Sequence, residues 1–383
     1  MKGSVKKRGS TWSYIFDLGK IDGKRKQKTK GGFKTKKEAS EALNEAMYRY
    51  KTGFIEPKKM YFDDYMNNYL ENSIKINRKI NTYFRYKELY EKYIKNHIGF
   101  LAVSEIRPLH IENILIEAKK TGISGSTLQS IYGVINSSLN KALKLQIINN
   151  NPCTYVERPK REKFEANTLT IDEINKLYKA LDTAEEGDYI IGLALRIILE
   201  LGLRRGELGG LEWKNIDLEN KTINITNNLV YTNNNVILTT TKTSESIRTI
   251  LISDELVSVL KAHRKQQLSD RLRYGEFYIE NYFNNIKYDF IMTWENGKYV
   301  HPNYYTLKFK KILNKIGIDR NIRFHDLRHT NATLLLQCGI NFKVIQRRLG
   351  HADINTTMNI YSHVDIKMQE DATEKISKLI GEK

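Results

Sequence analysis

The stretch IIGLALRIILELGLRRGEL, residues 190–208, sets the interpretation of this 383-residue sequence. It contains the longest apolar run of the chain, which only one arginine and one glutamate interrupt, and it predicts a buried helix over Ile190–Leu201. A glycine and two arginines follow, so a turn after the helix would expose Arg204 and Arg205 beside a hydrophobic core. The arginine and the glutamate leave no uninterrupted apolar run of the roughly 20 residues that a membrane span needs.

The residues around this helix predict a mixed, mainly helical domain with a small β-sheet over 165–383. Thr170 and Glu173 form a capping box that begins a helix. Helical periodicity returns from Asn303 onward. Between these helices, runs of β-branched residues predict strands over Thr222–Ile225, Val236–Thr239 and Arg248–Ile252. The Asn-rich piece Thr232–Asn235 predicts a hairpin tip.

The middle of the chain, residues 58–160, predicts an all-α domain. Apolar residues recur at helical spacing, most clearly over Ser126–Leu145, and such stripes are typical of a helical core. The charged stretch Pro159–Lys163 reads as a linker to the next domain. Basic residues between the stripes form a patch that is a candidate DNA-binding surface. The candidate DNA-binding residues of this patch are Lys79, Arg85 and Lys87.

Residues 1–57 predict a small α+β module, a three-stranded sheet plus one helix. Strand-like runs come first, and a capping box at Thr35 and Glu38 begins a helix that ends near Lys51. Basic residues alternate along the last strand, and a face so basic is expected to meet solvent or phosphate. That face carries either Lys24, Lys26, Lys28 and Lys30 or Arg25 and its neighbours, and all five are candidate DNA-binding residues.

The net charge of the chain is +19, which predicts a polyanionic partner and most simply nucleic acid. Residues 1–60 hold 17 Lys or Arg against 6 Asp or Glu, so +11 of the excess lies in less than a sixth of the chain, which predicts a basic N-terminal module. A merely solvated face is the alternative for any such charge run. The two cysteines, Cys153 and Cys338, exclude a disulfide framework and a cysteine-based zinc site, which fits a reducing cytosol.

Three local clusters carry residues suited to phosphate chemistry. Arg204 and Glu207 lie in the first, where two arginines could bind phosphate or simply pair with the glutamate at the surface. The second, His325-Asp326-Leu327-Arg328-His329, places His325 and Arg328 on one helix face. The third is Leu349-Gly350-His351, a helix end with a glycine cap, followed by Tyr361.

A zinc site is the alternative for the second cluster, because His325 and His329 at i,i+4 imitate half of a zinc-binding motif. Asp326 is one methylene shorter than the glutamate of that motif, and no obvious third ligand follows. We therefore expect no metal and no cofactor.

Together the clusters suit one reaction, in which a tyrosine hydroxyl attacks a DNA phosphodiester and arginines neutralise the charge of the transition state. Lys242, on a predicted hairpin, is the candidate acid that protonates the leaving 5′ oxygen. A phosphotyrosyl ester conserves the bond energy, so the reaction needs neither ATP nor metal.

In this order the residues resemble the tyrosine recombinase family, the relatives of phage lambda integrase, and especially integrases of Gram-positive phages and conjugative elements. The resemblance covers the whole chain and implies an arm-type DNA-binding module, a core-type DNA-binding domain and a catalytic domain. It implies that Arg204 rather than Arg205 is catalytic, with Glu207 as its support. The implied catalytic residues are Arg204, Lys242, His325, Arg328, His351 and the nucleophile Tyr361.

The resemblance also implies the partners of the chain. The chain is expected to bind double-stranded DNA at core-type and arm-type sites and to form a homotetramer on that DNA. An excisionase and a host DNA-bending protein are further candidate partners. Residues 364–383 predict an amphipathic tail helix. Its apolar stripe, which would pack on its own domain or on a neighbouring protomer, consists of Met368, Ala372, Ile376 and Ile380.

Two other functions compete with the recombinase. A type IB topoisomerase uses similar chemistry but needs no arm-binding module, and the basic residues of 1–57 argue against it. A non-catalytic DNA-binding regulator could descend from a recombinase, but all six catalytic candidates are intact.

We predict that Tyr361→Phe binds DNA as tightly as the wild type yet forms no covalent adduct, because only the hydroxyl attacks phosphorus while the ring keeps its packing. Denaturing gels of protein incubated with a nicked crossover-site duplex measure the adduct. If the phenylalanine variant still carries DNA under denaturing conditions, the nucleophile is another residue.

Overall fold

The computed structural model describes residues 3–21, 24–51, 60–161, 167–182, 189–240 and 247–350, and in the C-terminal segment residues 373, 374, 376–378, 380 and 381. Three of the candidate catalytic residues, Lys242, His351 and Tyr361, lie outside the described residues. The chain divides into two units, Met1–Lys163 and Phe164–Lys383, and each unit is described by itself.

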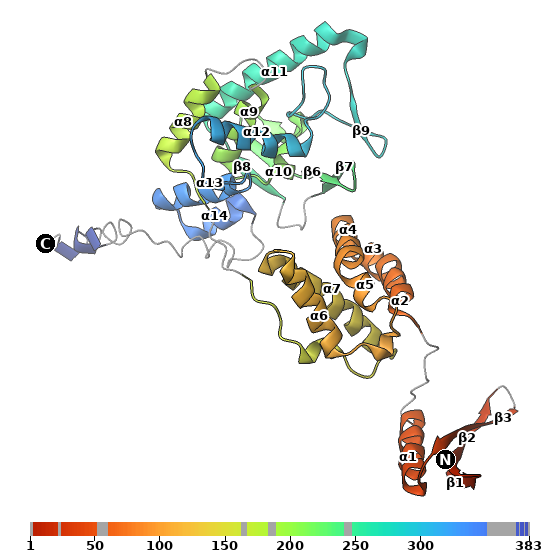
Figure 1. Cartoon of the computed structure of the whole chain (residues 1–383). Helices are drawn as coiled ribbons and strands as arrows, with labels where there is room; N and C mark the ends of the chain where they lie inside the picture. Colours follow the sequence, from red (N-terminus) through yellow and green to blue (C-terminus); the bar gives the residue numbers. More distant parts are fainter. Residues whose placement is uncertain are drawn as a thin grey trace. The chain divides into compact units, whose positions relative to one another are not determined.

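The first unit begins with an antiparallel sheet of three strands in the order β1-β2-β3, as the sequence predicts. Helix α1 packs on this sheet (Figure 1) and begins at the predicted capping box, where the Glu38 N–H donates to Thr35 Oγ1 over 3.1 Å. Tyr14, Phe16 and Leu43 form a small core between sheet and helix. The bounds are β1 (Gly3–Arg8), β2 (Thr11–Ile21), β3 (Lys24–Phe33) and α1 (Lys36–Lys51).

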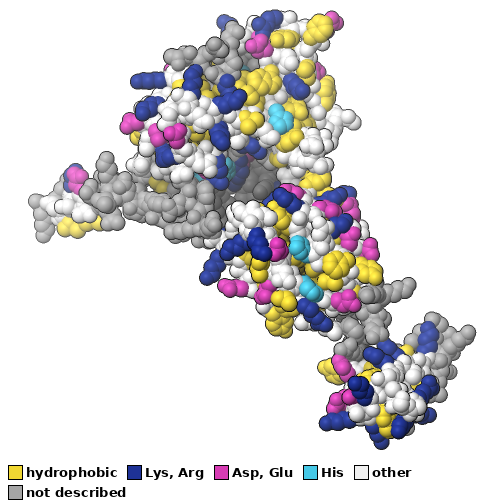
Figure 2. Space-filling view, viewed as in Figure 1, with side chains coloured by type: hydrophobic (Ala, Val, Ile, Leu, Met, Phe, Trp, Pro, Cys, Tyr) yellow, Lys and Arg dark blue, Asp and Glu magenta, His cyan; other side chains and the backbone are white. Residues whose placement is uncertain are grey.

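The strand register corrects one expectation about this module. Lys28 pairs with Phe16 and Lys30 pairs with Tyr14, so both lysines lie on the sheet face that α1 covers rather than on the free face. Directly paired residues share a face of a sheet, and Phe16 and Tyr14 belong to the core. Lys26 and Lys30 are exposed and Lys28 is half-buried. Figure 2 shows Lys and Arg side chains spread over the surface of the module.

The rest of the first unit is helical, as predicted, with four long helical segments. Two of them contain a π-helical turn, at Leu70–Ile74 and at Tyr90–Ile94. Such turns hold one extra residue per turn and are frequent at functional sites. The helices are α2 (Phe62–Tyr69), α3 (Lys75–Asn77), α4 (Ile80–Leu89), α5 (Lys95–Ile98), α6 (Pro108–Lys120) and α7 (Gly125–Lys144).

Hydrogen bonds that are buried or partly buried fix the two π-containing segments. The Tyr90 hydroxyl donates to Asp63 Oδ1 over 2.6 Å, and the Tyr65 hydroxyl donates to the carbonyl oxygen of Ser138 over 2.6 Å. Tyr83 donates in the same way to Glu71. The first two bonds connect α2 to the π-helical turn Tyr90–Ile94 and to α7, and the third connects the π-helical turn Leu70–Ile74 to α4. These tyrosines therefore hold the helices in register.

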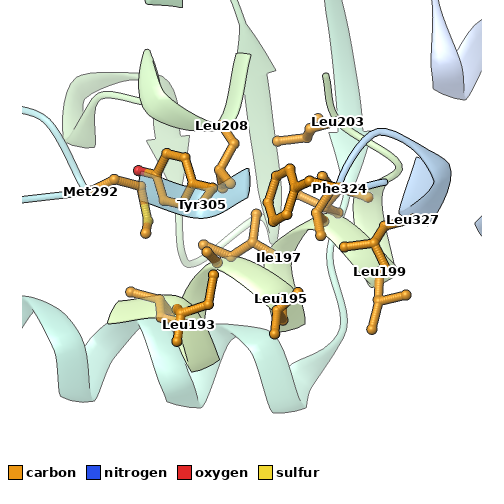
Figure 3. Close-up of a cluster of buried hydrophobic side chains, with 14 of the residues drawn as sticks. Leu193, Leu195, Ile197, Leu199, Leu203, Leu208, Met292, Tyr305, Phe324 and Leu327 are labelled. Atoms are coloured by element: carbon orange, nitrogen blue, oxygen red, sulfur yellow. The ribbon is translucent and has the colours of Figure 1, made fainter. Parts of the chain in front are cut away.

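The second unit is built around α9 (Tyr189–Leu201), the helix predicted from the apolar run. Leu193, Leu195, Ile197 and Leu199 of this helix point into one buried cluster (Figure 3). The cluster also takes side chains from helices on either side of α9: α8 (Ile171–Asp182), α11 (Asp254–Tyr274), α12 (Pro302–Lys315) and α13 (Asp326–Gln337).

Small antiparallel sheets complete the second unit. One has the order β4-β5-β8, and β6 with β7 forms a separate hairpin whose tip, Asn233 and Asn234, has positive φ values of 45° and 58°. Asparagine tolerates that conformation, so the predicted tip is confirmed. The sequence did not predict all of these strands. They are β4 (Ile216–Asp217), β5 (Thr222–Ile225), β6 (Asn227–Thr232), β7 (Asn235–Thr240), β8 (Arg248–Leu251), β9 (Asn281–Phe283) and β10 (Ile286–Tyr288).

The described part of the C-terminal segment is helical. Ile376 and Ile380 are 59% and 77% exposed, whereas Met368 and Ala372 of the predicted stripe lie outside the described residues. No helix in the described ranges is long and apolar enough to cross a lipid bilayer.

Candidate active site

The turn after α9 begins the candidate active site. Gly202 has a left-handed backbone with φ of +64°, and a Cβ there would lie 2.4 Å from Leu349 Cδ2 and 2.6 Å from Asn331 Oδ1. Only glycine satisfies both the conformation and the space. The chain then becomes extended at Arg204, which is the N-cap of α10 (Arg205–Gly209).

Glu207 closes this turn on Arg204. Its Oε2 accepts from the Arg204 N–H over 2.9 Å, and its Oε1 accepts from Arg204 Nη1 over 2.6 Å. The glutamate is only 2% exposed because Leu203 and Leu208, on either side of the turn, belong to the buried cluster of Figure 3. The Arg-x-x-Glu spacing of the sequence therefore brings an arginine and a buried carboxylate together, as predicted for the pair.

A second arginine, Arg248, holds the same carboxylate. Its Nη2 lies 2.9 Å from Glu207 Oε2, and its Nη1 donates to Oε1 over 3.3 Å. Burial alone would raise the pKa of Glu207, but the bonds to Arg248 and the charge of Arg204 lower the pKa to about 2. Glu207 is therefore ionised throughout the physiological pH range.

Sequence reasoning missed Arg248, although the sequence contained a signal. The strand alternates buried and exposed residues, so that Arg248 shares the buried face with Ile250, while Thr249 and Leu251 are exposed. A cation at an inward position of a strand needs a buried anion. That requirement would have indicated a partner such as Glu207.

The C-terminal end of α14 (Phe342–Leu349) meets three arginines through its backbone. The carbonyl oxygen of Arg348 accepts from Arg248 Nε over 2.7 Å, that of Leu349 from Arg328 Nη2 over 2.5 Å, and that of Gly350 from Arg204 Nη2 over 2.8 Å. The last carbonyls of a helix lack intrahelical partners and carry partial negative charge, so cations stabilise them. Gly350 ends the helix in the left-handed conformation, as predicted.

Arg328 is the most deeply placed of these arginines, with 2% exposure. Its Nη1 donates to the carbonyl oxygen of Gly202 over 2.7 Å, so it joins the turn after α9 to the end of α14. Burial and the neighbouring Arg204 guanidinium lower the pKa of Arg328 to about 9. The side chain therefore stays protonated at neutral pH.

His325 precedes α13 as its N-cap and is exposed at the surface. Its ring meets that of His329 edge to face, with centroids 5.5 Å apart. Although the residue is exposed, neighbouring protein atoms displace part of the hydration of its ring, and this loss, followed by the nearby charges of His329 and Arg328, lowers the pKa of His325 to about 4. The imidazole is therefore neutral at pH 7 and can both donate a hydrogen bond and accept a proton.

The carboxylate of Asp326, which lies between these histidines in the sequence, is already bound by Arg323. Asp326 is 1% exposed and accepts from the Arg323 N–H over 2.8 Å and from Arg323 Nη2 over 2.7 Å. Among the described residues, no group of three or more His, Cys, Asp or Glu side chains could hold a metal ion.

Arg205 turns away from this cluster. Its Nη1 donates to Thr306 Oγ1 over 3.0 Å and lies 3.4 Å from Asn303 Oδ1, both on α12. Of the two adjacent arginines, Arg204 is thus the one that joins Glu207 and the end of α14.

The structure brings together Arg204, Glu207 and Arg328, with His325 beside Arg328. The other three predicted catalytic residues lie outside the described residues. In the sequence, His351 directly follows Gly350, whose carbonyl Arg204 binds, and Lys242 lies between strands β7 and β8.

The candidate DNA-binding residues of the helical domain lie at its surface. Lys79 is the exposed N-cap of α4, and Arg85 and Lys87 are exposed on that helix. Arg85 is 2.9 Å from Glu88, which offsets part of its charge. In the N-terminal module, the side chains of Lys24 and Arg25 lie outside the described residues.

The charge of the site suits an anionic ligand. Three guanidinium groups, of Arg204, Arg248 and Arg328, surround one carboxylate, so positive charge remains in excess. The Arg204 side chain is 33% exposed and is accessible to a ligand. Guanidinium forks match phosphate oxygens in geometry, and a partly buried site strengthens the attraction.

Three families match the chain, each over a separate segment. Residues 4–47 match the arm DNA-binding domain, residues 61–119 match the phage integrase N-terminal SAM-like domain, and residues 167–368 match the phage integrase family. The last match covers more than half of the chain.

Similar proteins and structures agree with these matches. A tyrosine recombinase XerC-like protein of Caldanaerobacter subterraneus subsp. tengcongensis is 30% identical over 363 residues, or 90% of each chain. The Tn1549 transposon integrase, solved in complex with a circular intermediate DNA, has a TM-score of 0.69 at 19% identity over 83% of this chain and 99% of that chain. A lambda integrase tetramer bound to a Holliday junction has a TM-score of 0.62 at 15% identity, covering 87% and 89%.

We predict that Glu207→Gln lowers the free energy of unfolding by about 3–5 kcal/mol, because it leaves the buried Arg248 without its anion. Glu207 has a folded pKa below its ordinary value, so its contribution is complete above pH 4.5 and is lost as the pH falls towards 2. Urea unfolding of both proteins from pH 7 down to pH 2 measures this, and the difference should narrow in acid.

The matched control is Glu173→Gln, which removes a more exposed pair with Arg320 in the same unit. It should cost less than about 1 kcal/mol. Equal losses for the two variants would show that the shared carboxylate has no special role.

Proposed function

Because the chain belongs to the phage integrase family, it is an enzyme of site-specific DNA recombination, and we propose that it cuts and rejoins DNA through a 3′-phosphotyrosine intermediate on Tyr361. One observation carries the proposal. Arg204 and Arg328, which are 124 positions apart in the sequence, meet at the carbonyls directly before His351. This arrangement can hold one phosphate between the two arginines.

The proposed cleavage step exchanges one phosphodiester for another. The Tyr361 phenol oxygen attacks the scissile phosphorus, the bond from phosphorus to the 5′ oxygen breaks, and Lys242 gives a proton to that oxygen. His351 or His325 accepts the phenol proton. In the joining step a 5′-hydroxyl from the partner strand attacks the phosphotyrosine and the phenol is restored.

Arg204 and Arg328 would bind the non-bridging oxygens, on which negative charge grows in the transition state. Their bonds to backbone carbonyls fix them before DNA arrives, so little reorganisation is needed. His325, neutral because of its lowered pKa, would donate a hydrogen bond to the same phosphate. As the anion approaches, the pKa of His325 rises and the ring becomes a better proton acceptor.

We further propose that the chain integrates and excises a mobile element as a homotetramer on DNA. The Tn1549 transposon integrase was solved with a circular intermediate DNA, and the lambda integrase was solved as a tetramer on a Holliday junction. The fold that this chain shares with both supports the proposal. An excisionase and a host DNA-bending protein would complete the assembly.

The N-terminal module would bind arm-type sites through the sheet face that α1 leaves free. The register places Lys6 with Ser13, Arg8 with Thr11, and Ile15 with Thr29 on the face opposite the core. Lys6 and Arg8 are exposed, and a two- or three-stranded surface fits the major groove. Lys79, Arg85 and Lys87 would contact phosphates at the core-type site.

Excision in cells tests the proposed function. The gene with its flanking DNA is placed on a plasmid, and the new junctions are amplified and sequenced, which also identifies the crossover site. A duplex of that site with a nick beside the cleavage position then traps the covalent adduct. Trapping without strand exchange between two duplexes would indicate a topoisomerase, and binding without trapping would indicate a regulator.

We predict that Arg204→Ala slows formation of the adduct by roughly 10²- to 10³-fold, as loss of a transition-state donor does. Arg205→Ala should have a far smaller effect because its guanidinium is bound to Asn303 and Thr306. Single-turnover cleavage of the nicked duplex gives both rates. The opposite ranking would assign the catalytic role to Arg205.

We predict that the double variant Lys6→Ala with Arg8→Ala weakens binding to arm sites and lowers the salt dependence of binding by about one unit of slope for each cation. The matched control, Lys28→Ala with Lys30→Ala, removes the same charge from the face that carries the core. Gel shifts at several salt concentrations compare the two, and deletion of residues 1–57 should abolish arm binding. A larger loss for the control pair would place DNA on the other face.

A further inference from the structure

The side chain of Arg248 joins parts of the site that are distant in the sequence. It binds both oxygens of Glu207, and its Nε donates to the carbonyl oxygen of Arg348 over 2.7 Å. Its guanidinium also packs on Gly350, where an added Cβ would lie 3.1 Å from Nη1. Arg248 thus lies between the turn that carries Arg204 and the helix end that precedes His351.

We propose that Arg248 is a positioning residue, which holds Glu207 and the end of α14 in the arrangement that presents Arg204 and Arg328 to the scissile phosphate. The inference rests on the proposed function. All three guanidinium nitrogens of Arg248 are bound to Glu207 or to the carbonyl oxygen of Arg348, so Arg248 acts through these neighbours rather than on DNA.

Charge gives the first argument. Glu207 Oε1 is shared between Arg204 Nη1 at 2.6 Å and Arg248 Nη1 at 3.3 Å. With Arg248 present, the carboxylate is balanced by a buried cation, and the charge of Arg204 remains available for a phosphate. Without Arg248, the buried carboxylate would have Arg204 as its main partner, and the site would have less positive charge to offer.

Geometry gives the second argument. Residues 348, 349 and 350 each receive a bond from a different arginine, and Arg248 supplies the first of the three. Loss of that bond would free the carbonyl of Arg348 and let the helix end move away from Glu207. Arg248 also begins strand β8, six positions after Lys242 in the sequence, so it fixes where the chain leaves the segment that contains the proposed acid.

The experiment compares Arg248→Met and Arg248→Lys with the wild type on the nicked crossover-site duplex. We expect Arg248→Met to slow adduct formation at saturating protein by roughly 10- to 100-fold, the usual effect of removing a partner that orients a functional group. The dissociation constant for the same duplex should change less than about threefold. Lysine keeps the charge but cannot span carboxylate and carbonyl, so Arg248→Lys should recover the rate only in part.

A double-mutant cycle tests the route of the effect. If Arg248 acts in part through Glu207, the loss caused by Arg248→Met should be smaller in a Glu207→Gln background than in the wild type, whereas fully multiplied losses would overturn the proposal. Arg320→Met, which breaks an arginine–glutamate pair elsewhere in the unit, is the matched control and should keep the wild-type rate. A wild-type rate for Arg248→Met would also overturn the proposal.

If Arg248→Met does not fold, hydrogen exchange of Arg248→Lys without DNA still tests the proposal. In Arg248→Lys, hydrogen exchange should be faster at the Gly350 amide, which donates to the carbonyls of Gln346 and Arg347, while the amides of α9 stay protected. Unchanged exchange together with an unchanged rate would overturn the proposal. If the wild type itself forms no adduct, the proposed function fails, and the exchange result still tests whether Arg248 holds the helix end.

Discussion

A single buried carboxylate holds this catalytic unit together. Glu207 is almost fully enclosed, and an ion so enclosed is tolerated only where cations and hydrogen bonds replace water. Arg204 supplies the replacement from the adjacent turn and Arg248 supplies it from a strand. Because the buried carboxylate needs both contacts, the site forms as the domain folds.

Helix ends provide the rest of the scaffold. Asn331 Nδ2 donates to the carbonyls of Leu199 and Glu200 over 2.8 and 3.0 Å, at the end of α9, and Arg328 binds the carbonyl of Gly202 just beyond it. Arg328 also reaches the end of α14. One face of α13 therefore satisfies the free carbonyls of two other helices, and the negative ends of those helices meet where the arginines gather.

Patterns that depend on neighbours in the chain were predicted well. The capping boxes at Thr35 and Thr170, the helix Ile190–Leu201 and the hairpin tip at Thr232–Asn235 are all confirmed, since each depends on local backbone chemistry. The three-part fold class is confirmed as well. Motif spacing alone brought Arg204, Glu207 and Arg328 into one hypothesis, and the structure places them together.

What the sequence did not predict depends on pairing between distant segments. Arg248 has no local feature that names Glu207 as its partner, 41 positions away. The face occupied by Lys28 and Lys30 likewise follows from a strand register that alternation alone cannot set, because a shift of one residue exchanges the two faces.

The arginines bind the end of α14 through its main-chain carbonyls, and this constrains how the sequence of such a protein can evolve. A carbonyl oxygen is the same whichever amino acid bears it, so replacement of Arg348 would leave that acceptor in place. Insertion or loss of one residue before Leu349 is different, because it turns the helix end by about 100° and shifts it by about 1.5 Å. Drift at this end of the helix should therefore conserve the length of the helix more strictly than the residue type at position 348.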